Sequence, residues 1–324
     1  MDFLLLVGGL IVLMAGGSVL VRGATALALR FNISTLVVGV TVVSFGTSAP
    51  ELFISLNAAL ASHGDIVFGN VIGSNIANLA LVLGVSATIF HIKVSQNSIS
   101  IDWPVMMGAT LLFILFILDE HPRTLNKWEG LVFVIALTVF VTWLIRKSRK
   151  DELARVGDQK NFIEGQSHLS IWKIIAFLVA GCIALAVGAE LLVNGAVGIA
   201  QTMGISERLI SLTVIAFATS VPELATSIIA LVKRESDISI GNLIGSNIFN
   251  ILGILGVTAI VTELSTGMPL TMDDPNLFND MWWMIGIGLV TFIFMKSQKR
   301  IKHWEGMVLL ALYIVYILWI TTGH

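Results

Sequence analysis

Ten apolar runs occupy nearly the whole chain, and each is about as long as a helix that crosses a bilayer. A hydrocarbon core about 30 Å thick requires about 20 predominantly apolar residues per helix. Hydrophobic residues make up 56% of the 324 residues and charged residues only 12%, and the mean hydropathy is +0.91. This composition leaves no room for a sizeable soluble domain, so we predict an all-α integral membrane protein.

The predicted spans cover roughly 3–29, 34–62, 67–91, 101–118, 128–146, 171–201, 206–232, 238–262, 280–296 and 303–322. The first run is too long for a secretory signal and lacks a positively charged start, so we expect a retained helix. Cys182 is the single cysteine of the chain. It therefore permits neither an intrachain disulfide nor a Cys-rich zinc site.

The chain repeats itself at a shift of 172 residues. This shift aligns Gly17–Gly84 with Ala189–Gly256 without a gap, including GNVIGSNIAN on GNLIGSNIFN. Each half holds five predicted spans, and an odd number of spans turns the second copy upside down in the membrane. We therefore predict ten transmembrane helices in two inverted five-helix repeats, 1–146 and 171–324, joined by a polar loop, 147–170.

Lys and Arg gather in alternate loops, which sets the orientation because basic residues favour the cytoplasmic side. With the amino terminus outside, the outside loops hold only Arg123, Lys127 and Arg208, and the inside loops hold the remaining loop cations. We expect a multi-pass protein of the cell (inner) membrane with both termini outside and residues 147–170 in the cytoplasm. That loop is predicted to be a solvated connector, the alternative being a regulatory or lipid-binding role.

Two carboxylic acids lie inside apolar spans, at equivalent positions of the repeat. The sequence FGTSAPE ends at Glu51, and FATSVPE ends at Glu223. Pro50 and Pro222 cannot donate a backbone hydrogen bond, so we predict broken helices 2 and 7 in the core of the bundle. Backbone carbonyls freed in this way are tolerated in a membrane only where they line a polar interior.

An ionised carboxylate inside a bilayer costs at least a few kcal/mol unless it is paired, neutralised or solvated. Neither motif contains Lys, Arg or His, so a metal cation is the natural partner. Further oxygen donors share a helical face with the acids or lie on the next span of each repeat: Thr47, Ser48, Ser74 and Asn78, and Thr219, Ser220, Ser246 and Asn250. Such donors suit Ca²⁺ or Na⁺ and suit Zn²⁺ or copper poorly.

Each feature also has a structural interpretation. One Thr-Ser-x-Pro-Glu motif alone is explained equally well by a kink with a protonated Glu, but packing does not demand the same acid twice. The Gly-Asn pairs ending at Asn70 and Asn242 are expected to shape the start of a helix rather than to bind an ion. Asn75 and Asn247 are either helix–helix hydrogen bonds or ligands.

The paired motifs GTS-x-PE and GN-x-IGSN-xx-N resemble those of the calcium/cation antiporter superfamily, and within it the prokaryotic sodium/calcium exchanger-like proteins. The resemblance covers essentially the whole chain. It implies a ten-helix fold with an ion-binding core of helices 2, 3, 7 and 8, across which helices 1 and 6 slide.

The resemblance also implies roles for individual residues. Glu51 and Glu223 would be shared by Ca²⁺ and Na⁺, with Thr47 and Thr219 supplying oxygens to both ions. Flanking Na⁺ positions would be completed by Ser48, Ser74, Ser220 and Ser246, the middle of the site by Asn78 and Asn250, and backbone carbonyls by Ser44 and Ala216.

Two residues depart from the family pattern. Asn250 stands where some exchangers have an Asp that is associated with potassium dependence, so we expect no K⁺ co-transport. Ala218 stands where Gly is usual in the FGTS motif, which alters the expected backbone geometry at the second break.

We therefore predict a secondary active antiporter, in which Na⁺ influx drives Ca²⁺ exit through one midplane site. Ca²⁺/H⁺ exchange on the same fold is the alternative, and a cation channel is less favoured. The chain has no His-Glu-x-x-His motif and no Cys/His nucleophile pattern, so we expect no enzyme and no cofactor. The expected partners are membrane lipid and the two ions, with no nucleic acid and no obligate protein partner.

Overall fold

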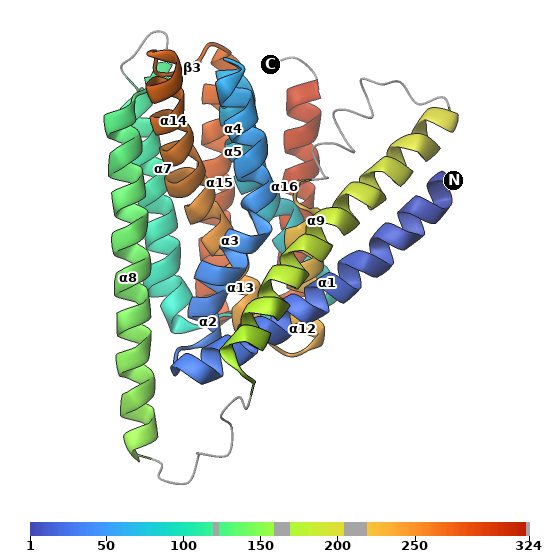
Figure 1. The fold of residues 1–324 in the computed structure, drawn as a ribbon, viewed down its shortest axis with the longest axis vertical. Helices are drawn as coiled ribbons and strands as arrows, with labels where there is room; N and C mark the ends of the chain where they lie inside the picture. Colours follow the sequence, from blue (N-terminus) through green and yellow to red (C-terminus); the bar gives the residue numbers. More distant parts are fainter. Residues whose placement is uncertain (119–122, 159–168, 204–218, 322–324) are drawn as a thin grey trace. The chain divides into compact units, whose positions relative to one another are not determined.

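The computed structural model describes residues 1–118, 123–158, 169–203 and 219–321, and nearly all of these residues are helical (Figure 1). The described elements are α1 (Asp2–Phe31), α2 (Thr35–Val38), η1 (Gly39–Val43), α3 (Ser44–Thr47), α4 (Ala49–Leu60), α5 (Gly64–Ile76), η2 (Ala77–Val82), α6 (Leu83–Ile89), β1 (Ile92–Lys93), η3 (Ser98–Asp102), α7 (Trp103–Ile117), β2 (Arg123–Leu125), α8 (Lys127–Asp158), α9 (Ile171–Thr202), α12 (Val221–Val232), α13 (Ser236–Ile248), η6 (Phe249–Leu255), α14 (Gly256–Thr266), β3 (Leu270–Met272), α15 (Pro275–Gln298), β4 (Arg300–Ile301) and α16 (His303–Thr321). The η elements are π-helical, and the strands form two short antiparallel pairs, β1 with β4 and β2 with β3.

Within the described residues, eight helices are long and apolar enough to cross a membrane, or nine if a bent pair counts as one span. These nine correspond to nine of the predicted spans, with ends that differ by a few residues. The predicted span 206–232 is described only from Thr219 onwards, where α12 covers its second half. The chain is thus a multi-pass, all-helical membrane protein, and the ten-helix inverted repeat stays a prediction.

Helix α8 continues past the end of its apolar run. The sequence places the end of the fifth span near residue 146, but α8 ends at Asp158. The added turns consist largely of Lys, Arg, Glu, Leu and Ala, which are good helix formers even where they face water. Ser148 on this extension is buried, and its hydroxyl accepts a hydrogen bond from the backbone N–H of Ser34 at 2.8 Å.

The described chain forms two compact units, each made of two segments. The first unit contains residues 1–47 and 143–242, and the second unit contains residues 48–142 and 243–324. Each unit therefore combines parts of both predicted repeats.

In the first unit, α1 and α9 lie side by side (Figure 1). Glycines line their contact: a Cβ built on Gly16 would lie 2.8 Å from the Cβ of Ala184, and one built on Gly188 would lie 2.8 Å from the backbone nitrogen of Leu13. Small residues let two helix backbones approach this closely, and lipid-embedded helices use such contacts in place of a hydrophobic driving force. Any larger side chain at these positions would push the helices apart.

In the second unit, the repeated Trp-Glu-Gly sequences make the same contact twice. A Cβ on Gly130 of α8 would lie 2.7 Å from the carbonyl oxygen of Gly256, and one on Gly306 of α16 would lie 2.8 Å from that of Gly84. Gly256 and Gly84 are themselves equivalent in the repeat. The second unit therefore contains two copies of one glycine-to-glycine helix contact.

The Glu of each Trp-Glu-Gly sequence caps the start of its own helix. Glu129 accepts a hydrogen bond from the backbone N–H of Asn126 at 2.8 Å, and Glu305 accepts one from that of Lys302 at 2.7 Å. This is the arrangement of a capping box, in which a Glu or Gln in the first turn satisfies a free backbone donor. These two acids therefore have a structural role.

Unusual backbone conformations recur at the repeat spacing. Ser62 and Arg234 occupy equivalent positions and both have a positive φ, 62° and 64°. Such values are uncommon for residues other than Gly. The π-helical segments η2 and η6 also begin at equivalent residues, Ala77 and Phe249. The repeat thus extends from the sequence to the local backbone.

We predict that Gly9→Ala destabilises the protein by about 1–3 kcal/mol through overpacking. A Cβ on Gly9 would lie 2.8 Å from the carbonyl oxygen of Gly188 and from the Cα of Leu192. Gly8→Ala is the matched control, because a Cβ on Gly8 has no atom within 4 Å and Ala favours a helix over Gly. Thermal unfolding in detergent measures both variants, and an equal melting temperature for the two would contradict the close packing of α1 on α9.

Candidate cation-binding site

The predicted break in the second span is present. The two helical parts, α2 to α3 and α4, are bent by 46°, and Ser48 between them has φ −89° and ψ 5°. Ser220, which precedes α12, has nearly the same conformation, with φ −91° and ψ 0°. Pro50 and Pro222 each lie in the first turn of the helix that follows, where the missing N–H of Pro would have no helical partner in any case.

The two acids occupy the first turns of these helices. Glu51 is 2% exposed and Glu223 is 0% exposed. The amino-terminal end of a helix carries a positive partial charge, which stabilises a nearby carboxylate and offsets part of the cost of burying it. Each break therefore produces a local environment that favours an anionic side chain inside an apolar span.

Asn70 connects the Glu51 turn to the next helix. Asn70 belongs to α5, and its side-chain Nδ2 donates to the carbonyl oxygen of Glu51 at 3.3 Å and to the hydroxyl of Ser55 at 2.9 Å. Both acceptors belong to α4. The sequence assigned Asn70 to the shape of a helix start, whereas its observed contacts fix α4 against α5.

In the first unit, the equivalent asparagine holds the end of α3. The hydroxyl of Thr47 donates to Oδ1 of Asn242 at 3.1 Å, and the hydroxyl of Ser44 donates to the carbonyl oxygens of Gly39 at 2.7 Å and Asn242 at 3.0 Å. The Ser44 hydroxyl is therefore engaged within the protein, and its carbonyl oxygen lies 3.4 Å from the Thr47 hydroxyl.

The first unit also contains the described donors of the second motif, FATSVPE. Ser220 is fully buried, and its hydroxyl has no hydrogen-bond partner within the described ranges. Thr219 is half-buried. Ala216, the remaining predicted donor of this motif, and Ala218 lie outside the described residues.

In the second unit, two π-helical segments bear the predicted amide ligands. Asn78 lies in η2 and Asn250 in η6, and single π-turns inside α-helices are frequent at functional sites. The side-chain oxygens of both asparagines, like the hydroxyl of Ser74, are buried without a hydrogen-bond partner in the described part of the chain. An unsatisfied buried oxygen costs about 1–3 kcal/mol, and a hard cation is a group that would satisfy all three.

Asn75 and Asn247 form helix–helix hydrogen bonds, one of the two alternatives that the sequence left open. Nδ2 of Asn78 donates to Oδ1 of Asn247 at 3.2 Å, and Nδ2 of Asn250 donates to Oδ1 of Asn75 at 3.2 Å. Each bond joins a residue of one repeat to the non-equivalent asparagine of the other repeat. Each π-helical segment is therefore linked by an amide contact to the α-helix that precedes the other one, η2 to α13 and η6 to α5.

The structure distributes the predicted ligands over both units and buries nearly all of them. The second unit holds Ser48, Glu51, Ser74, Asn78, Ser246 and Asn250, and the first unit holds Ser44, Thr47, Thr219, Ser220 and Glu223. Within the second unit, carboxylate, hydroxyl and amide oxygens from both repeats belong to one compact body. Such a donor set has the chemistry of a site for Ca²⁺ or Na⁺.

The contacts of several residues around these donors were not predicted from the sequence. Asn70 and Asn242 had a signal, because they occupy equivalent positions in the repeat. Met106 and Met284 accept hydrogen bonds from Asn247 and Asn75, at 3.5 and 3.6 Å. These methionines had no signal, since they fall outside the gapless alignment and a buried Met in an apolar helix is ordinary.

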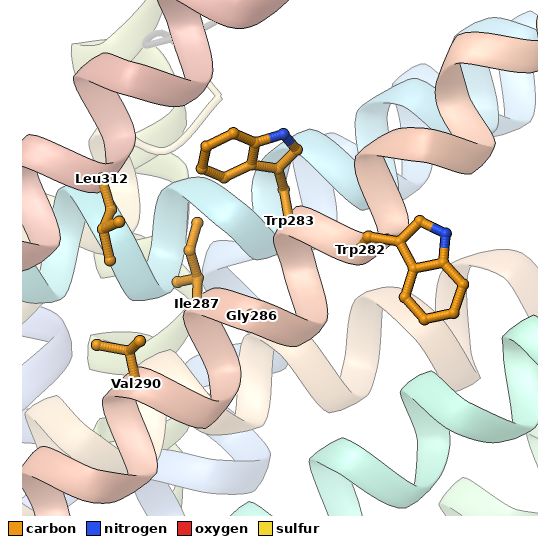
Figure 2. A pocket seen from close by; sticks show the side chains of 6 residues that line it. All are labelled: Trp282, Trp283, Gly286, Ile287, Val290 and Leu312. Atoms are coloured by element: carbon orange, nitrogen blue, oxygen red, sulfur yellow. The ribbon is translucent and has the colours of Figure 1, made fainter.

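An apolar pocket of about 320 Å³ lies elsewhere in the second unit, and Figure 2 shows its lining. The six residues come from α15 and α16 and are Trp282, Trp283, Gly286, Ile287, Val290 and Leu312. None of them is a predicted ligand, and none carries a charge. The pocket therefore lacks the oxygen donors that a cation requires.

Comparisons with known proteins identify the family of the chain. A family model described as sodium/calcium exchanger protein matches residues 1–146 and 173–322. The putative antiporter CaxA of Alkalimonas amylolytica is 36% identical over 315 residues, which cover 95% of each chain. The sodium/calcium exchanger MaX1 of Methanosarcina acetivorans is 31% identical over 350 residues, covering 98% of this chain and 97% of that protein.

A solved structure has the same fold. The sodium-calcium exchanger NCX_Mj, soaked with zero Na⁺ and Ca²⁺, aligns with a TM-score of 0.78 and 31% sequence identity over 98% of both chains. The matches extend over both predicted repeats and the acids of both motifs. The chain therefore belongs to the sodium/calcium exchanger family.

Proposed function

We propose that the protein is a secondary active antiporter that exchanges Na⁺ for Ca²⁺ by alternating access at one midplane site. The pair of buried acids carries this proposal, because Glu51 and Glu223 occupy equivalent first turns of the helices that follow Ser48 and Ser220. Two carboxylates balance the charge of one divalent cation. The similarity to MaX1, which is named a sodium/calcium exchanger, supports the choice of ions.

In this proposal each predicted residue has the role that the family resemblance implies. Glu51 and Glu223 bind Ca²⁺ and Na⁺ in turn, helped by the oxygens of Thr47 and Thr219 and the backbone carbonyls of Ser44 and Ala216. The flanking Na⁺ positions use Ser48, Ser74, Ser220 and Ser246, and Asn78 and Asn250 supply amide oxygens at the middle of the site. The partnerless oxygens of Ser74, Asn78, Ser220 and Asn250 support this assignment.

Coupling follows from competition for the same carboxylates. Ca²⁺ and Na⁺ cannot occupy Glu51 and Glu223 together, so the ion that arrives down its gradient displaces the other. We further propose that both termini lie outside the cell and that the connection 147–170 is cytoplasmic, since this orientation places most loop Lys and Arg inside.

The driving ion is tested by Ca²⁺ uptake into vesicles that contain the purified protein. We expect an outward Na⁺ gradient to drive uptake of radioactive Ca²⁺, because outgoing Na⁺ vacates carboxylates that Ca²⁺ then occupies. A pH gradient without Na⁺ is expected to drive none. Uptake driven by the pH gradient alone would identify a Ca²⁺/H⁺ antiporter, and Ca²⁺ flux that needs no counter-ion would identify a channel.

The role of the acids is tested by removing one charge at a time. Glu51→Gln and Glu223→Gln are each expected to lower Na⁺-driven Ca²⁺ uptake at least about 30-fold, because breaking a buried charge pair costs about 2–5 kcal/mol. Glu305→Gln is the matched control: Glu305 is equally buried, at 2% exposed, but caps a helix, a role that Gln also performs. Wild-type uptake in either site variant would contradict the proposal.

Acid should inhibit transport. Protonation removes the charge of a carboxylate, and a protonated Glu51 or Glu223 no longer balances Ca²⁺. We expect Na⁺-driven uptake to fall between about pH 7 and about pH 5, and a higher Ca²⁺ concentration to restore part of it. An uptake rate that stays constant down to about pH 5 would be incompatible with ionised carboxylates as the ligands.

A further inference from the structure

Two hydrogen-bond relays run through the second unit, and each ends on a predicted amide ligand. In the first relay, Nδ2 of Asn247 donates to the sulfur of Met106 at 3.5 Å, and Oδ1 of Asn247 accepts from Nδ2 of Asn78 at 3.2 Å. Oδ1 of Asn78 then has no hydrogen-bond partner in the described ranges. All three side chains are at most 3% exposed.

The second relay has the same order of residue types, with the two repeats exchanged. Nδ2 of Asn75 donates to the sulfur of Met284 at 3.6 Å, and Oδ1 of Asn75 accepts from Nδ2 of Asn250 at 3.2 Å. Oδ1 of Asn250 is likewise buried without a partner. Nδ2 of Asn75 also donates to the backbone carbonyl oxygen of Asn247 at 3.5 Å.

The chemistry of the three groups gives each relay a direction. A thioether has no hydrogen to donate and accepts only, so it selects the NH₂ side of the amide that faces it. The oxygen of that amide then faces the next asparagine, which must present its own NH₂. Its oxygen is thereby turned away from the relay, and the methionine at one end determines which atom is free at the other.

We propose that Met106 with Asn247, and Met284 with Asn75, are positioning residues that fix the amide orientation of Asn78 and Asn250. This inference rests on the proposed function, in which these two asparagines bind the transported cation through oxygen. An unconstrained amide rotates, and its NH₂ side repels a cation. The relays keep that side occupied, so that the cation meets only carbonyl oxygen.

The proposal makes a crosswise assignment. Asn247 of the second repeat orients Asn78 of the first repeat, and Asn75 of the first repeat orients Asn250 of the second. Packing within one helix would instead couple Asn75 to Asn78, which lie three residues apart and share a helical face. The two accounts therefore predict different pairs of interacting residues.

The gentlest test replaces the sulfur without changing the volume. Met→Leu changes at buried sites usually cost less than about 1.5 kcal/mol, so Met106→Leu and Met284→Leu should fold. The matched controls are Met107→Leu and Met281→Leu, which lie on the same two helices. Both methionines are buried, and neither hydrogen-bonds an asparagine within the residues that the structure describes.

Two measurements are made on each variant in its full-length form. Initial rates of Na⁺-driven Ca²⁺ uptake give the half-saturating Ca²⁺ concentration and the maximal rate. Thermal unfolding in detergent, with and without Ca²⁺, gives the stabilisation by the ion, which depends on binding and not on transport.

We expect Met106→Leu and Met284→Leu to raise the half-saturating Ca²⁺ concentration about 3- to 10-fold, which corresponds to one lost hydrogen bond. The maximal rate and the melting temperature without Ca²⁺ should match those of the controls. Half-saturating concentrations equal to those of Met107→Leu and Met281→Leu would overturn the proposal, and so would a loss of ion-free stability that accounts for the whole effect.

Alanine variants then test the crosswise pattern. In the Asn78→Ala variant the oriented amide is already absent, so adding Asn247→Ala should not weaken the Ca²⁺-dependent stabilisation further. Adding Asn75→Ala to Asn78→Ala should weaken that stabilisation again, because Asn75 orients Asn250. Additive losses in the first pair would overturn the relay. Unchanged Ca²⁺ binding in Asn78→Ala and in Asn250→Ala would instead remove these residues from the proposed ligand set, which distinguishes failure of the proposed site from failure of the relay.

Discussion

A polar atom buried in a membrane protein has no water to bind, so the protein or a ligand must satisfy it. This constraint governs the arrangement around both motifs. Helices α4 and α12 begin directly after Ser48 and Ser220, so that Glu51 and Glu223 lie in first turns whose positive ends accommodate the acids. The asparagines that follow satisfy one another's NH₂ groups through the reciprocal contacts. Within the described residues, the side-chain oxygens of Ser74, Asn78 and Asn250 have no hydrogen-bond partner, and oxygen is the atom type that a hard cation binds.

Most of the fold was predictable because its signals are local. Hydropathy locates the spans, and Pro50 locates the break, since both depend only on nearby residues. The end of α8 at Asp158 was not predicted, because hydropathy reports where a helix leaves the apolar region and not where the helix ends. In the sequence, the only sign of the close pairing of α1 with α9 was the presence of scattered glycines. The pairing itself was not predictable, because tertiary packing determines which helix faces each glycine.

The candidate site was predictable to the level of residue type and position. The repeat identified Glu51 and Glu223 as candidates, because helix packing does not require the same acid at equivalent positions of both copies. The hydrogen-bond partners were not predictable in the same way. Whether Asn75 faces a ligand or another helix depends on the rotation of that helix, and the role of Met284 depends on a third element. Neither quantity is encoded in spacing along one span.

The crosswise asparagine contacts have a consequence for how such a chain can evolve. After a duplication, the sequences of the two copies ordinarily diverge, because selection acts on each copy separately. Here a substitution at Asn247 removes a hydrogen bond of Asn78, and a substitution at Asn75 removes one of Asn250. A change in either copy therefore affects the other copy. A substitution at one of these asparagines alters a hydrogen bond of the other half, and a matched change in the other half would be needed to keep it.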